Sequence, residues 1–335
     1  MNNRIKTVDA ARGIAILLVI LGHCCYSLDE PINKVILSFH MPLFFFISGL
    51  IAKTYVTKRG GGYFLNKLKM ILLPQITLGV ISYIYDLLFT VALRKGAFTD
   101  VDFFYCIWRW WFLPVLFVVT ILFYYLSKFL DYGKLSVRVG VILTDGVLII
   151  LMTYIVSFPD ETPFYLNVVP MAFLFYFAGY MLKPIIHKEL GNKQYGLIMI
   201  VAIVLLILFS QMNSYVTMYN NNYGNIGIFF MCCICGIYVI WYIADKLKNV
   251  DVLNWIGKNS IIIYVWQFKL AEFYKNIAEI VVGKVHVLYD DLVRTLIAFL
   301  LVIVTVIPII IISNKYFPFI YGKSRTKANR SNKMN

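Results

Sequence analysis

Apolar runs long enough to cross a lipid bilayer recur along the whole chain, and they restrict the fold more than any other feature of the sequence. About 17 to 25 apolar residues span the hydrocarbon core as a helix. Of the 335 residues, 61% are hydrophobic and 14% are charged, against roughly 25% charged residues in a soluble domain. We therefore predict an all-α, polytopic membrane helix bundle with about ten transmembrane helices, at residues 9–27, 35–56, 70–93, 103–126, 137–157, 167–186, 195–213, 225–245, 259–275 and 291–314.

The distribution of Lys and Arg predicts how the chain is oriented. Most of the 31 basic residues lie in every second loop, whereas the loops 157–167 and 213–225 contain none. Because cytoplasmic loops are enriched in Lys and Arg, both termini are expected to be cytoplasmic. The same spread accounts for the net charge of +14 without a nucleic-acid partner. Residues 1–315 are expected to form one transmembrane domain, and residues 316–335 a basic, disordered cytoplasmic tail suited to anionic membrane lipids.

Two residues that hydrocarbon should reject bracket the first span. Arg12 and His23 are eleven positions apart, so both leave the same face of a helix, about 16 Å apart along its axis. Burying a charge in a membrane helix costs several kcal/mol, so such a residue is by default a functional candidate. In a plainer interpretation, Arg12 reaches the cytoplasmic headgroups, partly neutralised by Asp9, and His23 lies at the outer interface.

The second span adds another histidine at a comparable depth. In the segment SFHMPLFFFISGL, His40 lies within the first two turns from the outside. Imidazole gains and loses a proton near neutral pH, so His23 and His40 are candidates for a general base or a proton relay. No Asp or Glu lies at ligand spacing beside them, and no metal is expected. Ser48 and Gly49, deeper in this span, favour close helix packing over catalysis, and Arg109, among tryptophans, fits an aromatic belt.

The segments with the two histidines belong to longer motifs. The first span reads D-x-x-R-G-x-A with an R-x10-H spacing, and the second reads F-H-x-P-L-F-F-F-x-S-G. Together with the weaker segments WWFLPVLF, FYFAGYML and WIGKNSIIIYVWQ, they make the chain resemble the acyltransferase-3 family of integral membrane O-acyltransferases over about residues 4–315. Within that family the chain is most similar to the fucose 4-O-acetylase-like group.

This resemblance implies an enzyme that moves an acyl group, often acetyl, from cytoplasmic acyl-CoA to a cell-surface or exported carbohydrate, and a location in the plasma membrane. The donor is expected to be acetyl-CoA. The implied catalytic residues are His23, as general base or transient acyl carrier, Arg12 and His40. Arg12, Lys67, Lys69, Ser48 and Gly49 would contact the donor, Arg109, Trp111 and Gln267 would bind the acceptor, and Asp9 would be structural.

Two positions depart from the family's pattern. Gln267 stands where relatives often have His, and an amide forms hydrogen bonds but does not titrate. The arginine-rich cluster expected after the second span is reduced to Lys67 and Lys69, which would meet the phosphates of CoA as point charges.

Two other classes of function remain open at this stage. A transporter or flippase would bind a polar solute or a glycan precursor in the bundle and use the histidines as a proton relay, although no inverted repeat is visible. A catalytically silent scaffold of a glycan-export assembly is the other class. Turnover of acyl-CoA by the protein separates the enzyme from both.

Overall fold

The computed structural model describes residues 3–55, 62–93, 102–108, 110–130, 135–155, 163–184, 186, 193–282 and 290–321, and these residues form helices joined by irregular segments and one isolated β-bridge. The helices are α1 (Asn3–Cys24), α2 (Pro31–Leu37), α3 (His40–Leu50), α4 (Gly62–Lys67), η1 (Leu68–Leu72), α5 (Leu73–Leu93), α6 (Phe103–Trp108), α7 (Phe112–Leu130), α8 (Leu135–Ile150), η3 (Leu151–Ile155), η4 (Pro163–Val168), α9 (Val169–Leu182), α10 (Lys193–Met212), η5 (Met218–Asn220), α11 (Ile226–Lys246), α12 (Asp251–Lys258), α13 (Ser260–Val282), α14 (Asp290–Tyr316) and η6 (Pro318–Tyr321). The predicted all-α, polytopic membrane bundle is confirmed.

Among the described residues, nine helical segments are long and apolar enough to cross a membrane. The expected span 259–275 falls in α13, whose charged residues lower its hydropathy, and α13 is not one of the nine. The α12–α13 segment nevertheless covers the depth of α1. A Cβ on Gly257 would overlap the carbonyl of Asp9 near the start of α1, and Lys275 Nζ donates to Cys25 O, 2.7 Å away, just beyond its end. The α12–α13 segment therefore lies along the length of α1, and the tenth crossing stays a prediction.

Three expected spans differ from the observed helices because each is interrupted. The second begins at Pro31 and breaks at Phe39, between α2 and α3. The third begins at Gly62 and includes the π-helix η1, and the fourth is divided between α6 and α7. Irregular backbone at membrane depth is tolerated where protein surrounds it. The cytoplasmic location of both termini stays a prediction, and the tail beyond Tyr321 lies outside the described residues.

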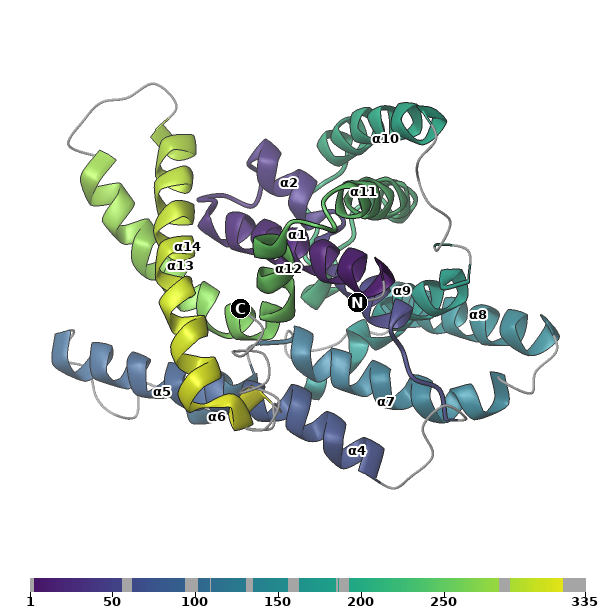
Figure 1. The fold of residues 1–335 in the computed structure, drawn as a ribbon, viewed down its shortest axis with the longest axis horizontal. Coiled ribbons are helices and arrows are strands. Elements are labelled where there is room, and N and C mark those ends of the chain that lie inside the picture. The colour runs from purple at the N-terminus through teal and green to yellow at the C-terminus, as the bar shows by residue number, and fades with distance from the viewer. Residues whose placement is uncertain are drawn as a thin grey trace.

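Helix α1 runs through the middle of the bundle, and α12 lies directly against its first half (Figure 1). Two glycines make this contact possible. A Cβ on Gly13 would overlap the carbonyl oxygen of Leu253, and a Cβ on Gly257 would overlap that of Asp9. Small residues let membrane helices approach backbone to backbone, where packing holds them together. Gly13, which directly follows Arg12, therefore has a packing role.

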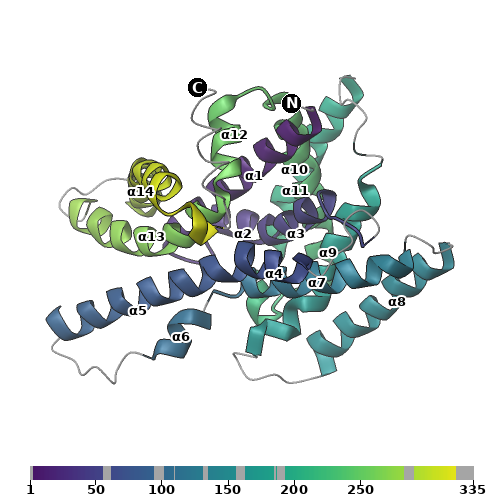
Figure 2. The same cartoon turned by 60° about the horizontal axis from the view of Figure 1, so that its bottom comes forward.

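Helices α13 and α14 pack together on one side of α1, and α13 also contacts α5 (Figure 2). Lys269 Nζ of α13 donates to Asp86 of α5 over 2.6 Å and to Glu272 over 3.3 Å. An unpaired charge at this depth would be costly, so the ion pair ties the two helices together. Helices α8 and α10 lie at the periphery, where only 11% and 17% of their spanning windows are buried, and they present apolar side chains to lipid.

Candidate active site

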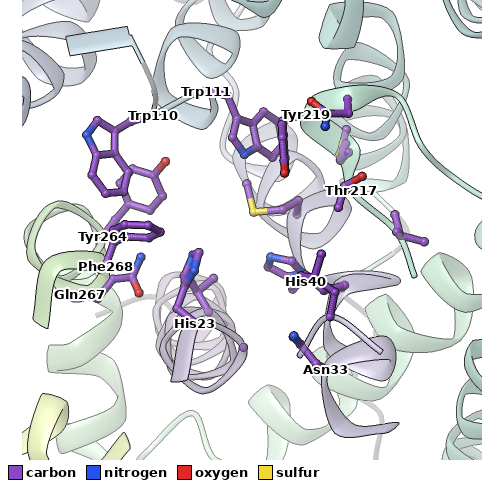
Figure 3. A pocket seen from close by; sticks show the side chains of 18 of the residues that line it. His23, Asn33, His40, Trp110, Trp111, Thr217, Tyr219, Tyr264, Gln267 and Phe268 are labelled. Carbon is purple, nitrogen blue, oxygen red and sulfur yellow. The ribbon is translucent and has the colours of Figure 1, made fainter. Parts of the chain in front are cut away.

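A cavity of about 450 Å³ lies beside the second half of α1 (Figure 3). Its volume is within the range of small-molecule sites, roughly 300 to 1,000 Å³. The walls of the cavity come from α1, Leu28, the α2–α3 segment, Trp110 and Trp111, Tyr165 of η4, the loop 216–220, and α13. Because these parts are distant in sequence, the cavity exists only in the folded bundle.

His23 projects into this cavity from the last turn of α1 (Figure 3). Its side chain is exposed, and the cavity is the space it faces. The imidazole packs edge-on against Phe268, with ring centroids 5.2 Å apart, and Phe268 in turn meets Trp110 at 4.7 Å. The aromatic rings hold one flank of His23 and leave the other toward the cavity. His23 therefore occupies the position that a group acting on a bound molecule requires.

His40 enters the same cavity from the first residue of α3 (Figure 3). Its Nδ1 lies 2.8 Å from the carbonyl oxygen of Ile36. A carbonyl only accepts hydrogen bonds, so Nδ1 carries the proton, and in the neutral ring Nε2 carries the lone pair. The break between α2 and α3 makes this bond possible because it brings the α2 carbonyl to the ring. His40 is thus held in the tautomer of a proton acceptor.

Arg12 lies in the first half of α1, away from the cavity. It is half-buried and within electrostatic range of Asp9 and of Tyr176 on α9. Asp9 is also within range of Lys258, at the end of α12. The cavity reaches along α1 to Val19, and Arg12 is not among its described lining residues. The stripe that joins Arg12 and His23 is therefore open at the His23 end and packed at the Arg12 end.

Lys67 lies on the same side of the bundle as Arg12. Its ammonium group sits 5.6 Å from the ring centroid of Tyr63, and Tyr63 is within electrostatic range of Tyr176, the residue that neighbours Arg12. Lys69 lies in the π-helix η1 and is exposed. Two of the three expected phosphate-binding cations are thus linked through two tyrosines, and Lys69 follows Lys67 by two residues.

Ser48 and Gly49 lie at the contact between α3 and α9. A Cβ on Gly49 would overlap the carbonyl oxygen of Tyr176, and a Cβ on Gly179 would overlap that of Phe46. Ser48 is half-buried beside this contact. Their position suits the packing interpretation, and a role of either residue in donor binding stays a prediction.

Of the three residues expected to bind the acceptor, the structure describes two. Trp111 and Gln267 both line the cavity. Arg109 lies outside the described residues. Among the residues that are described, no group of three or more His, Cys, Asp or Glu is arranged to hold a metal ion.

The model of the acyltransferase 3 family, described as an acyltransferase domain, matches residues 5–314. The chain belongs to this family. It is accordingly a multi-pass membrane enzyme that transfers acyl groups from a donor to an acceptor. The match extends to the family and does not single out the fucose 4-O-acetylase-like group. No curated protein and no solved structure matches the chain significantly.

The cavity of this acyltransferase is also lined by residues that the sequence motifs did not indicate. Asn33 of α2, Phe268 of α13 and the loop residues Thr217 and Tyr219 all line it. Asn33 precedes His40 by seven positions, but the break at Phe39 lies between them, so helical spacing from His40 did not indicate Asn33. The loop carried no signal either, because only the folding of α10 and α11 brings it over the cavity.

Proposed function

We propose that this acyltransferase moves an acyl group, most simply acetyl, from cytoplasmic acyl-CoA to a hydroxyl of a cell-surface or exported carbohydrate, and that it works in the plasma membrane. The single observation that carries the proposal is that His23 and His40 face one cavity while Arg12 lies on the same helix, about 16 Å from His23. A pantetheine arm is long enough to cover that distance. The charges that bind a donor and the groups that act on an acceptor are then joined by one helix.

The two histidines suit a transfer in two steps. In the first step, a ring nitrogen of His23 attacks the thioester carbonyl, and the proton of the His23 ring passes to the departing CoA thiolate. In the second step, His40 Nε2 removes the proton of the acceptor hydroxyl as its oxygen attacks the acyl-imidazole. The ester forms, and the proton held by His40 restores neutral His23. Direct transfer with His23 as the base is the one-step form of the same reaction.

The donor would bind at the opposite half of α1. Arg12, Lys67 and Lys69 would meet the phosphates of CoA from the cytoplasm, with Arg12 able to form paired hydrogen bonds and the lysines acting as point charges. Tyr176, which is within electrostatic range of both Arg12 and Tyr63, and the Lys67 ammonium group 5.6 Å from the Tyr63 ring centroid support a shared anion site. Asp9 would keep Arg12 oriented along the helix.

The acceptor would enter the cavity from the loop 216–220. Aromatic side chains form much of the wall, including Trp110, Trp111 and Tyr264. Aromatic rings of this kind have an apolar face, and Trp and Tyr carry a polar group at the edge. They therefore match a sugar ring, which has apolar C–H faces and hydroxyl groups around its edge. A carbohydrate is therefore the acceptor class that the cavity suits best.

Purified protein incubated with acetyl-CoA labelled in the acetyl group tests the proposal. Wild type should release CoA thiol and acquire label transiently, His23→Ala should acquire none, and His40→Ala should accumulate label because the second step is blocked. Loss of turnover in both variants without label in any sample would select the one-step form. Wild type that neither releases CoA nor transfers label would overturn the function, and solute uptake lost in His23→Ala would favour a transporter.

A further inference from the structure

Two buried side-chain amides at the cavity have polar atoms without hydrogen-bond partners. Gln267 is 0% exposed, and neither its Nε2 nor its Oε1 has a partner. Asn33 is 2% exposed, and its Oδ1 has none. Buried polar groups in proteins are nearly always hydrogen-bonded, so each exception requires an explanation. Both residues line the cavity of about 450 Å³, which indicates that their partners belong to a bound molecule.

The orientation of Asn33 follows from its other hydrogen bond. Its Nδ2 donates to the carbonyl oxygen of Ser27 over 2.9 Å. Rotating the amide by half a turn would place oxygen against oxygen, so Oδ1 is the atom left to accept. Gly22 of α1 passes directly beside this oxygen, and an added Cβ there would lie 3.3 Å from it. Asn33 therefore has a fixed, unpartnered acceptor beside Gly22 in the wall of the cavity.

Gln267 presents both a donor and an acceptor. It precedes Phe268, the ring that packs against His23, so its position is coupled to the site. The next residue, Lys269, is tied to Asp86 of α5 by the 2.6 Å ion pair. These neighbours fix this turn of α13 and with it the place of Gln267 in the wall of the cavity. Gln267 and Asn33 lie at opposite sides of the two histidines (Figure 3).

The polar groups define the chemistry of the molecule that would satisfy them. Asn33 Oδ1 and His40 Nε2 require hydrogen-bond donors, and Gln267 pairs with a group that both donates and accepts. A hydroxyl does both, whereas a carboxylate or phosphate oxygen only accepts. Several hydroxyls on one ring meet all three residues at once.

We propose that Asn33 and Gln267 bind hydroxyl groups of the acceptor that are not acylated, and thereby select a polyhydroxylated ring with hydroxyls on both sides of the reacting one. The inference rests on the proposed function only in taking this ring to be the acyl acceptor. His40 then meets the hydroxyl between the two amides. Gln267 and Asn33 are specificity-determining residues, and the histidines remain the residues that move the proton and the acyl group.

Binding of sugars to the purified full-length protein, without acetyl-CoA, tests the inference. Trp110 and Trp111 line the cavity, so their fluorescence reports occupancy. The probes are the methyl glycosides of fucose, rhamnose, galactose and glucose, and the monodeoxy analogues of whichever binds best. Wild type should bind at least one glycoside. Gln267→Met, of similar length but apolar, should weaken that binding about tenfold.

One deoxy analogue should bind wild type about tenfold more weakly than the parent sugar does. Gln267→Met should bind this analogue no more weakly than it binds the parent sugar. Asn33→Ser should show the same pattern with a different analogue. Gln211→Met is the matched control, because Gln211 already donates to Pro31 O and lies outside the cavity lining. Thermal unfolding of each variant identifies any that fail to fold.

Unchanged sugar affinity in folded Gln267→Met, or no binding of any probe to wild type, would overturn the inference. These outcomes leave the proposed function testable, because release of CoA thiol from acetyl-CoA is measured separately. Conversely, the protein could bind sugar in a way that depends on Gln267 and yet transfer no acetyl group. That result would support the inferred binding of the ring and contradict the proposed reaction.

Discussion

The two ends of α1 use the same helix in opposite ways. At one end, His23 faces a cavity and touches aromatic rings. At the other end, Arg12 is half-buried at a packed junction with α9 and α12. Between them, Ala15 and Ile16 are fully buried. The difference teaches that one helix can border both a cavity and a closely packed charged junction; in the proposed function, a neutral acceptor enters the cavity and an anionic donor binds at the junction.

The largest expected effect concerns the open end. His23→Ala should lower acetyl transfer by about two to four orders of magnitude, because it removes proton transfer or the acyl carrier. His23→Gln should be as inactive, since an amide forms hydrogen bonds but does not titrate. The KM for acetyl-CoA should stay unchanged in both, as measured by release of CoA thiol. A raised KM for acetyl-CoA with a normal kcat would contradict the proposal that the His23 end acts in catalysis and the Arg12 end binds the donor.

The next effect concerns the charged end. Arg12→Gln should lower kcat/KM for acetyl-CoA about tenfold to a hundredfold, the contribution of a charge-assisted hydrogen bond, while sugar affinity is retained. Arg12→Lys should recover part of the loss, because the charge remains and the paired geometry is lost. Steady-state kinetics with varied donor measure both variants. Equal losses of donor and acceptor affinity in Arg12→Gln would contradict the proposed separation.

A smaller effect tests whether the packed junction is needed. Gly257→Ala places a Cβ against the carbonyl of Asp9 and should destabilise the protein by about 1 to 3 kcal/mol, with a lower unfolding temperature in detergent. Gly140→Ala is the matched control, because a Cβ at Gly140 in α8 meets no atom within 4 Å. It should leave stability unchanged or slightly raised. Equal stability of the two variants would show that α1 and α12 do not need their close contact.

The smallest effect concerns the outlying cations. Lys69→Gln should raise the KM for acetyl-CoA about twofold to fivefold at low salt, and the difference from wild type should shrink as salt is added. The charge of Lys69 is exposed to solvent and is screened, whereas the half-buried Arg12 is screened less. Kinetics at two ionic strengths measure the contrast. A loss in Lys69→Gln that salt does not change would show that Lys69 is part of the buried junction.

Much of the architecture was predictable from the apolar runs, because a bilayer admits only helices of spanning length and every such run has to become one. The interruptions were not predictable in the same way. The apolar run from residue 35 to 56 does not change in hydropathy at the break at Phe39, where local hydrogen bonds hold the turn: Phe39 N donates to Ile36 O over 3.3 Å, and Ser38 Oγ donates to Val35 O over 2.7 Å. The weak hydropathy of α13 was visible, and its neighbours explain how it is tolerated, because Lys269 pairs with Asp86.

The candidate site, like the fold, was predictable only in part from the sequence. Helical spacing predicted that Arg12 and His23 share a stripe, and the motif in the second span singled out His40, because regular geometry turns sequence distance into direction. The sequence did not indicate Asn33, Phe268 or Tyr219, which come from separate elements and meet only across the cavity.

By itself, the sequence determined the membrane class, the family, and the direction in which Arg12 and His23 point. Only the tertiary structure decided that His23 opens onto a cavity and Arg12 does not, which tautomer His40 holds, and that the amides of Asn33 and Gln267 have polar atoms there without hydrogen-bond partners. The physical reason is the range of the interactions involved. Helix periodicity and hydrophobic length act within one segment, whereas cavities and hydrogen-bond partners depend on how distant segments pack.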